Sequence, residues 1–186
     1  MIENKKDWEI SFKMDVKEAI EKRKSVRKYQ DKQISEDIIK ELLDAARRAP
    51  SAKNTQSHKY FIINDKKLIN KLKENNVFKQ PFVYDAPLII VCCANPKLYP
   101  ASVDVDDSPE HYALVDLSIA CSFLVLRATE LGLGTVFIAW VYRNKIKKIL
   151  NIPEEYIVPF AIPVGYPAEV PAGRTRKELN EIIFKK

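Results

Sequence analysis

Glycine is scarce in this sequence, which has 186 residues and only four glycines, at Gly132, Gly134, Gly165 and Gly173. A nucleotide-binding P-loop requires GxxxxGK[ST], and a dinucleotide-binding fingerprint requires GxGxxG at the start of a helix. The spacing of the four glycines supplies neither pattern. Both common backbone solutions for phosphate binding are therefore excluded, and a phosphorylated ligand would have to be held mainly by side chains.

Cysteine is also scarce, and long apolar runs are missing. Cys92 and Cys93 are adjacent and Cys121 stands alone, so they form neither a disulfide framework nor a CxxC metal site. We expect buried free thiols, a reducing compartment and no bound metal. No apolar run approaches the ~18 residues of a membrane span, and the first ten residues lack the apolar core of a signal peptide. These features predict a cytoplasmic protein without a membrane partner.

Charge is unevenly distributed along the chain. The 31 Lys and Arg residues exceed the 25 Asp and Glu residues by six. Residues 85–142 hold seven acids and two bases, a balance of −5, so the remainder carries +11. Such a basic remainder could bind nucleic acid through its phosphates, or it could simply keep Lys-rich helices soluble. We favour the second interpretation and expect no nucleic-acid partner, because no nucleic-acid-binding motif is present.

Length and hydrophobic periodicity predict a single α+β domain. The length fits one domain, and the hydrophobic share of 46% suffices for one core. Helices are expected over residues 14–23, 36–49, 66–74, 110–131 and 144–150, with Ser35 as an N-cap and Gly132 closing the longest one. Strands are expected over residues 60–63, 88–93, 135–141 and 156–164, the last broken by Pro159 and Pro163, while residues 176–184 could be helical or extended. Because Gly-rich turns are missing, an α+β sandwich is favoured over a doubly wound sheet.

The first polar cluster is the run from Arg23 to Arg27. If the segment is extended, Arg23, Ser25 and Arg27 point to one side, and on a helix the two arginines still share a face. Guanidinium groups match phosphate well because their planar fork donates paired hydrogen bonds and keeps its charge. The alternative is a solvated charged run at the end of a helix.

Two further polar clusters follow along the chain. Residues 49–56 place Ser, Asn, Thr and Gln side chains in a short loop, which could be turn chemistry alone or could bind the polar edge of a flat heterocycle. Residues 174–177 contain Arg174 and Arg176. Together with the first run, they hold half of the eight arginines of the chain.

These clusters, in this order, resemble the nitroreductase family of FMN-dependent oxidoreductases. The matching pieces are R-K-S-V-R-K-Y from Arg23, A-P-S-A-K-N-T-Q from Ala49, D-A-P from Asp85, L-G-L-G-T from Leu131, P-V-G-Y-P-A-E from Pro163 and R-T-R-K-E-L from Arg174. The resemblance implies an α+β fold, namely a three-layer α/β/α sandwich with a mixed, mostly antiparallel sheet. It further implies a homodimer with FMN at the subunit interface, and a single FMN-binding domain over residues 1–186. Residues 1–13 would be a flexible or partner-wrapping extension.

The resemblance also assigns cofactor contacts to residues of this sequence. Arg23 and Ser25 would hold the FMN phosphate and ribityl chain, and Arg174 and Arg176 would add phosphate contacts. Arg27 would reach the pyrimidine edge of the flavin, and the backbone N–H of Ala139 would face flavin N5. The full set of implied FMN-binding residues comprises Arg23, Lys24, Ser25, Arg27, Ala139, Arg174 and Arg176 from one subunit, and Pro50, Ser51, Ala52, Asn54 and Gln56 from its partner. No protein side chain is implied as catalytic, since the flavin carries the chemistry.

The implied activity is hydride transfer from NAD(P)H through flavin N5 to a nitroaromatic, a quinone or a similar small oxidant, in a ping-pong cycle. The alternative is a flavoprotein of the same fold that does not use NAD(P)H: a dehalogenase-like, flavin-cleaving or peptide-oxidising enzyme, or a flavin carrier. Ser57 and His58 stand where family members commonly have Pro and Trp, which leaves the substrate open. His58 could donate a proton or be structural, Phe137 and Trp140 could line the substrate face or the core, and residues 100–109 could form a lid or a solvated loop.

Overall fold

The computed structural model describes residues 14–99 and 108–184. The expected N-terminal extension at residues 1–13 and residues 100–107 of the possible lid lie outside the described residues.

The centre of the fold is a four-stranded sheet with the strand order β1-β2-β4-β3. The strands are β1 (His58–Ile63), β2 (Leu88–Ala94), β3 (Gly134–Thr135) and β4 (Ile157–Gly165), and each neighbouring pair is antiparallel. All seven residues of β2 are buried, which confirms the central position expected for a strand that is apolar on both faces.

Five α-helices surround the sheet: α1 (Val16–Lys22), α2 (Glu36–Arg47), α3 (Lys66–Glu74), α4 (Pro109–Glu130) and α5 (Arg143–Leu150). Two predicted end signals are confirmed. The Ser35 hydroxyl accepts a hydrogen bond from the backbone N–H of Ile38 at the start of α2, and Gly132 adopts φ +73° just after α4, a conformation that glycine adopts without steric cost.

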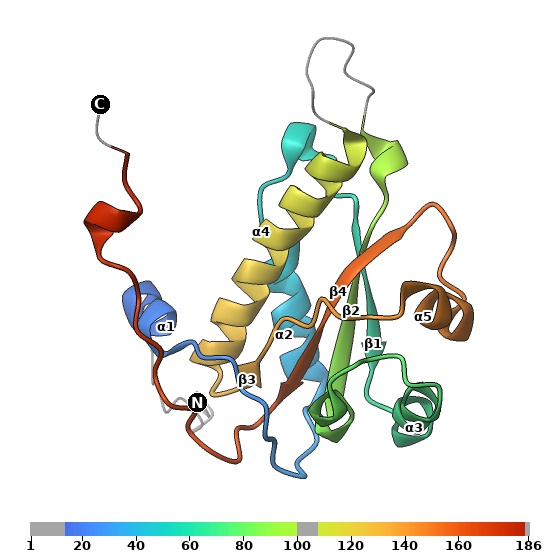
Figure 1. Cartoon of the computed structure of the whole chain (residues 1–186), viewed down its shortest axis with the longest axis horizontal. Coiled ribbons are helices and arrows are strands. Elements are labelled where there is room, and N and C mark those ends of the chain that lie inside the picture. The colour runs from blue at the N-terminus through green and yellow to red at the C-terminus, as the bar shows by residue number, and fades with distance from the viewer. Residues whose placement is uncertain (1–13, 100–107, 185–186) are drawn as a thin grey trace, which may run out of the picture.

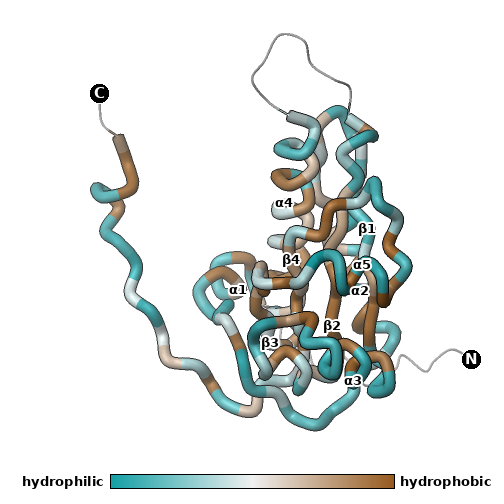
Figure 2. The backbone as a smooth tube through the Cα atoms, turned by 45° about the vertical axis from the view of Figure 1, so that its right-hand side comes forward, coloured by the Kyte–Doolittle hydropathy of each residue, from teal (hydrophilic) through white to brown (hydrophobic). Residues whose placement is uncertain are grey.

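Alternate residues of β2 enter two separate cores. Leu88 and Ile90 pack with α2 and α4 on one face of the sheet, while Ile89 and Val91 pack with α3 and α5 on the other. Figure 1 shows these helix pairs on opposite sides of the sheet, and Figure 2 shows the apolar character of the strands between them. The predicted α/β/α sandwich is confirmed.

The expectation that Pro159 and Pro163 break the last strand is wrong, because β4 runs through both prolines. Cys93 of β2 faces two β4 residues, Val158 and Pro159, so Pro159 sits at a bulge. Bulges tolerate proline because the ladder is already interrupted there. The backbone of Ala161 faces the β3 side of β4, where it exchanges two hydrogen bonds with Ile138. Pro163 lies two residues further along the strand, so its nitrogen faces the same side, although Pro163 is paired with Ile89 of β2.

The expected strand at residues 135–141 is only partly correct. Regular pairing covers Gly134 and Thr135, and the same register reappears as an isolated bridge between Ile138 and Ala161. In that register Val136 lies opposite Pro163, which has no N–H to donate. The ladder is therefore interrupted there, and residues 136–142 run beside β4 as an extended segment.

Helix α4 is strongly apolar over most of its length. By length and composition alone this helix of 22 residues could cross a membrane, since its most apolar 18-residue stretch has a mean hydropathy of 1.5, and 44% of that stretch is buried. Here α4 packs against the sheet and α2 as a core helix, although Leu114, Val115 and Phe123 are exposed. These three apolar side chains of α4 are therefore not covered by the described residues.

The C-terminal segment leaves the body of the domain. After β4 it passes α1 and then extends away from the sandwich, as Figures 1 and 2 show. Apart from the short 3-10 turn Leu179–Glu181 it is extended. Its apolar side chains are exposed, at Val170, Leu179, Ile182, Ile183 and Phe184.

Candidate functional site

The first basic run is an extended segment held against β3. Helix α1 ends at Lys22, and Arg23 already has extended dihedrals. Ser25 forms a parallel bridge with Thr135, and the backbone N–H of Val26 donates to the Thr135 carbonyl over 3.0 Å. Side chains therefore alternate along the segment, as predicted, and only Val26 is directed into the core, where it is 4% exposed.

Two glycines permit this close packing. A Cβ on Gly134 would lie 2.5 Å from Val26 Cγ2, and a Cβ on Gly165 would lie 2.7 Å from the Tyr29 ring. Tyr29 in turn donates a hydrogen bond from its hydroxyl to the Val26 carbonyl over 2.8 Å. Glycine at these positions therefore sets the location of the basic run, although no glycine loop cradles a phosphate.

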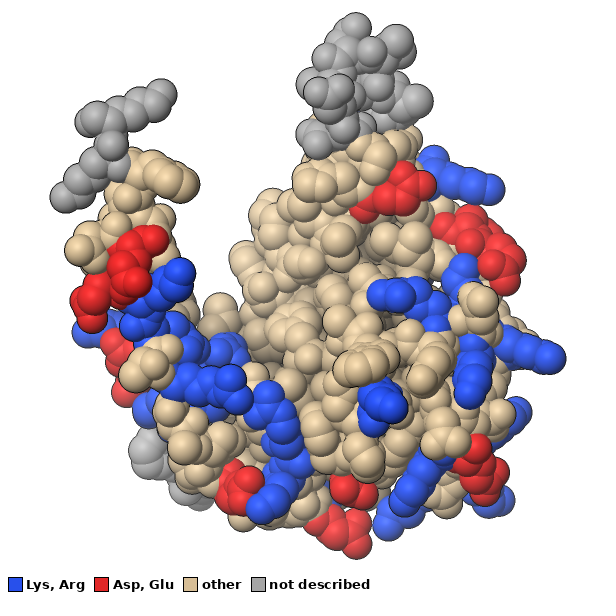
Figure 3. All heavy atoms as spheres, in the orientation of Figure 1, with Lys and Arg blue, Asp and Glu red and all other residues tan. Residues whose placement is uncertain are grey.

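The C-terminal segment completes a basic cavity next to this run. The cavity has a volume of about 80 Å³, and Figure 3 shows Lys and Arg side chains gathered where the segment passes α1. Six of the predicted FMN-binding residues come together here, accompanied by Pro171 and Ala172: Arg23, Lys24, Ser25, Arg27, Arg174 and Arg176.

The guanidinium groups in this cavity are not neutralised. Arg27 donates to the Ser25 carbonyl and Arg176 to the Arg174 carbonyl. Lys24 donates to the Pro171 carbonyl over 3.1 Å, which ties the C-terminal segment to the basic run. Within residues 14–99 and 108–184, no carboxylate forms an ion pair with the four arginines of the cavity. A phosphate group is the ligand that best fits such a donor set.

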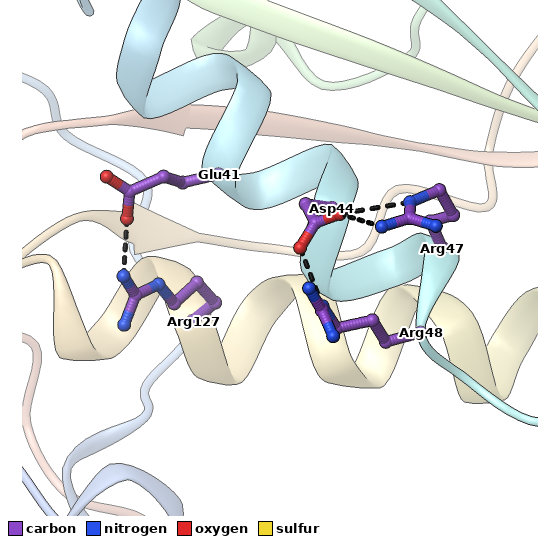
Figure 4. Close-up of polar contacts among 5 residues, drawn as sticks. All are labelled: Glu41, Asp44, Arg47, Arg48 and Arg127. Atoms are coloured by element: carbon purple, nitrogen blue, oxygen red, sulfur yellow. Dashed lines mark hydrogen bonds and ion pairs between the residues drawn. The ribbon is translucent and has the colours of Figure 1, made fainter.

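The arginines outside the cavity provide a contrast. Figure 4 shows Arg127 paired with Glu41 across α2 and α4, and Asp44 paired with both Arg47 and Arg48. Arg127 also pairs with Glu130 over 2.6 Å. These hydrogen bonds hold the pKa of Asp44 below its usual value and raise the pKa of Arg127. Three of the four arginines outside the cavity are thus paired with carboxylates, and the fourth, Arg143, donates to the Val158 carbonyl over 3.1 Å.

The second cluster, residues 50–56, forms a tight loop after α2. The Ser51 hydroxyl accepts from the backbone N–H of Gln56 over 3.0 Å, and the Thr55 hydroxyl donates to the Ala52 carbonyl over 2.5 Å. Asn54 is exposed, and its side-chain amide forms no hydrogen bond within the described part of the chain. Asn54 is therefore available to an external ligand.

The two predicted halves of the cofactor site lie at opposite ends of α4. The backbone N–H of Ala52 is bonded to Asp116 in the N-terminal half of the helix. Ser25 pairs with Thr135, which follows the C-terminus of α4 at Glu130. With a rise of ~1.5 Å per residue, the 14 residues from Asp116 to Glu130 span roughly 21 Å. One chain therefore does not bring its own basic cavity and its own 50–56 loop together.

Phe137, Ala139 and Trp140 are exposed in the 136–142 segment, whereas Ile138 is buried. Phe137 is 43% exposed and Trp140 is 59% exposed, so the core-packing alternative for them is wrong. The Phe137 ring contacts Phe160 edge-on at 5.2 Å, and the ammonium of Lys79 lies 5.8 Å from the Trp140 ring. Ala139 is exposed between these aromatic side chains.

His58 has an environment that favours a structural role. Burial lowers its pKa below the ordinary value, and the charge of Asp116 opposes this only in part. Burial therefore disfavours the protonated imidazole that a proton donor would need. Its Nδ1 is buried without a hydrogen-bond partner in the described structure.

Sequence reasoning missed one polar group close to the predicted loop. Asp116 is 4% exposed and accepts hydrogen bonds from Ala52 and from the Tyr99 hydroxyl. The available signal was an acidic residue in the middle of an apolar stretch of α4, away from Glu110 and Glu130 at its ends, since a buried carboxylate requires partners.

Comparison with known proteins matches this architecture. The model of the nitroreductase family matches residues 20–77 and 74–166. A relative from Methanothermobacter thermautotrophicus is 34% identical, with 97% of this chain and 91% of that protein covered, and it carries the provisional name NADH dehydrogenase/NAD(P)H nitroreductase. Iodotyrosine deiodinase of Nematostella vectensis is 25% identical, with 90% and 74% covered. The crystal structure of a nitroreductase family protein from Clostridium novyi is 33% identical with a TM-score of 0.74, and the match covers 84% of this chain and 87% of that one. On these matches, the chain belongs to the nitroreductase family.

Proposed function

We propose that the protein is a homodimeric FMN-dependent oxidoreductase that takes hydride from NAD(P)H. The observation that carries the proposal is the basic cavity, where four arginines converge and which no carboxylate among residues 14–99 and 108–184 lines. An anionic phosphate would compensate this charge. The NAD(P)H nitroreductase name of the relative from Methanothermobacter supports the choice of electron donor.

The residues of the cavity fit the phosphate end of FMN. Arg23, Arg174 and Arg176 would hold the phosphate by charge-assisted hydrogen bonds, and the Ser25 hydroxyl would add a neutral contact. Arg27 lies at the same cavity and is exposed, so its guanidinium can extend toward the pyrimidine edge. A fixed positive charge there favours the reduced, anionic state of the ring.

A second copy of the chain would complete the site. In an antiparallel dimer along α4, the 50–56 loop of one subunit would approach the basic cavity of the other. The exposed Leu114, Val115 and Phe123 on α4 and the apolar side chains of the C-terminal segment supply surface for such an interface. Asn54, with its unpaired side-chain amide, would be the contact from the partner.

Bound FMN would supply the redox chemistry by accepting hydride from a nicotinamide and returning it to a small oxidant such as a nitroaromatic or a quinone. The chain itself binds and orients. Ala139 offers a backbone N–H on the exposed segment, and Phe137 and Trp140 provide flat apolar surface beside it. Burial lowers the pKa of the half-buried His58, so we assign it no proton transfer.

Cofactor binding tests the proposal directly. Added FMN should bind at one molecule per subunit, which is measured by quenching of its fluorescence. Losing a charged hydrogen bond of about 1.5–3 kcal/mol should make Arg23→Ala bind FMN roughly 10- to 100-fold more weakly. The control Arg47→Ala removes an arginine that is paired with Asp44 and should keep the wild-type affinity. Failure of the wild type to bind FMN refutes the proposal.

Mixed dimers test the shared site. Arg23→Ala damages the basic cavity and Asn54→Ala damages the loop, so each variant alone should bind FMN weakly at both sites. A dimer with one subunit of each kind contains one fully damaged site and one intact site. Mixing should therefore restore one tight site per dimer, whereas sites built within single chains would show no restoration.

The deiodinase relative favours a second candidate, a flavoprotein of this fold that uses another electron donor. Both candidates require FMN at the same residues. They differ in the response to nicotinamides under anaerobic conditions, since only the first predicts rapid flavin reduction by NADH or NADPH.

A further inference from the structure

The buried carboxylate of Asp116 is hydrogen-bonded to the start of the 50–56 loop. Through Tyr99 it is also connected to Ser57, the residue that follows this loop. Asp116 Oδ2 accepts from the backbone N–H of Ala52 over 2.8 Å and from the Tyr99 hydroxyl over 2.6 Å. The Tyr99 hydroxyl also lies 2.9 Å from the hydroxyl of Ser57. Asp116, Tyr99 and Ser57 are at most 6% exposed, so water does not compete effectively for these bonds.

The backbone between these two points is strained. Lys53, Asn54 and Gln56 adopt φ of +53°, +55° and +50°, and none of them is glycine. This region of φ is costly for residues with a side chain, least so for Asn. Three such residues within four positions persist only if the surroundings hold them in place.

The hydrogen bonds inside the loop do not anchor it to the domain. They join Ser51 to Gln56 and Thr55 to Ala52, so they shape the loop but would allow it to tilt as a unit. Asp116 lies on α4, which is packed into the core. The carboxylate therefore provides the link between a shaped loop and a rigid helix.

The hydrogen bond between Tyr99 and Asp116 has the chemistry of a stable contact. A buried carboxylate needs donors, and Tyr99 keeps its proton because burial, assisted by the hydrogen bond to Asp116, raises its pKa to about 12. The Tyr99 ring also stacks on Tyr112 at 6.0 Å, so its position does not depend on the hydroxyl alone.

We propose that Asp116 and Tyr99 are positioning residues that hold the 50–56 loop in the conformation that presents Asn54 to the flavin of the partner subunit. This inference rests on the proposed function. It also refines the cofactor contacts, because the N–H of Ala52 is already committed to Asp116. The loop then offers FMN its side chains, above all Asn54, rather than this backbone donor.

Removing one hydroxyl tests the inference with little risk to folding. Tyr99→Phe keeps the stacked ring and leaves Asp116 bonded to Ala52. We expect FMN to bind about tenfold more weakly, equivalent to about 1.4 kcal/mol, because the cofactor must then select the productive loop conformation. Backbone hydrogen exchange of Ala52 should become faster in the free protein, a readout that does not depend on FMN.

Two further variants separate positioning from general stability. Asp116→Asn keeps an oxygen acceptor and should retain more FMN affinity than Asp116→Ala, which leaves two buried donors unpaired. The control Asp65→Ala removes another carboxylate that accepts a backbone N–H, from Leu68 at the start of α3. It should lower thermal stability but leave the FMN affinity and the exchange of Ala52 unchanged.

The outcomes distinguish the two proposals. If the wild type binds FMN and Tyr99→Phe shows the same affinity and the same exchange at Ala52, the positioning role is refuted while the proposed function stands. If Asp65→Ala weakens FMN binding as much as Tyr99→Phe does, general destabilisation explains the effect and the positioning role is again refuted. If the wild type does not bind FMN, both proposals fail.

Discussion

The substitution Gly134→Ala tests whether the close contact between Gly134 and Val26 determines the position of the basic run against β3. The Cβ of an alanine would lie 2.5 Å from Val26 Cγ2 and 2.6 Å from Val26 Cβ. Both distances are far below contact distance, and Val26 is a stiff β-branched residue that is 4% exposed. Relief therefore requires the backbone of the basic run to move away from β3.

The expected cost of this overpacking is about 2 kcal/mol, in the middle of the usual range of ~1–3 kcal/mol. For a domain of this size, ~1 kcal/mol lowers Tm by about 2–4 °C, so Gly134→Ala should lower Tm by about 4–8 °C. FMN affinity should also fall, because Arg23, Ser25 and Arg27 move with Val26. Thermal unfolding followed by circular dichroism, together with FMN titration, measures both effects.

Gly173→Ala is the matched control. A Cβ at Gly173 meets no atom within 4 Å, and its φ is not in the left-handed region. The same Gly-to-Ala change there should leave Tm and FMN affinity nearly unchanged. Equal Tm values for the two variants would refute the claim that contact between Gly134 and Val26 positions the basic run.

Three further predictions concern separate residues. Arg27→Ala should make the flavin midpoint potential more negative by on the order of 30 mV, which is about 1.4 kcal/mol for two electrons, as measured by dye-coupled reduction; an unchanged potential would contradict its placement at the ring. Burial lowers the pKa of His58 in the folded state, so as the pH drops the unfolded chain takes up a proton at His58 before the folded chain does. The free energy of unfolding should therefore fall as the pH drops below about 6.5. His58→Gln should flatten this part of the Tm profile, and an unaltered profile would contradict the role of burial. Glu41→Gln removes one partner of Arg127 at the surface and should cost less than about 1 kcal/mol, with a smaller effect in high salt; a larger, salt-independent loss would be inconsistent with a solvated ion pair.

The sequence was most informative where a local signal coincides with the tertiary environment. Periodicity, with Ser35 as N-cap and Gly132 after the last turn, located α2 and α4 closely. The uninterrupted apolar run 88–93 identified the central strand because both faces of β2 are covered. The basic run was predicted to alternate if extended, and its pairing with β3 shows this.

The predictions of strand boundaries were wrong where the boundaries depend on pairing with neighbouring strands. Pro159 and Pro163 were predicted to break β4, but one lies at a bulge and the other faces away from β2. The missing N–H of Pro163 shortens β3 instead, an effect on a segment nearly thirty residues earlier in the chain. Whether a strand tolerates a proline depends on which neighbouring strand the proline nitrogen faces. The residues next to the proline in the sequence do not determine this.

The candidate site was likewise predictable from the sequence only in part. The three clusters were visible in the sequence because they are short and chemically distinct. The structure brings the first and third together in one cavity and places the second at the other end of α4. Asp116 escaped notice because its role depends on contacts with residues 64 and 17 positions away, Ala52 and Tyr99.

Anaerobic titration of the FMN-loaded protein with NADH and with NADPH tests the central claim most directly. At least one nicotinamide should bleach the visible absorbance of the flavin with one equivalent per FMN. A nitroaromatic or a quinone added afterwards should restore the oxidised spectrum. A bound flavin that stays oxidised with both nicotinamides, although dithionite reduces it, would contradict the account and favour a flavoprotein with a different electron donor.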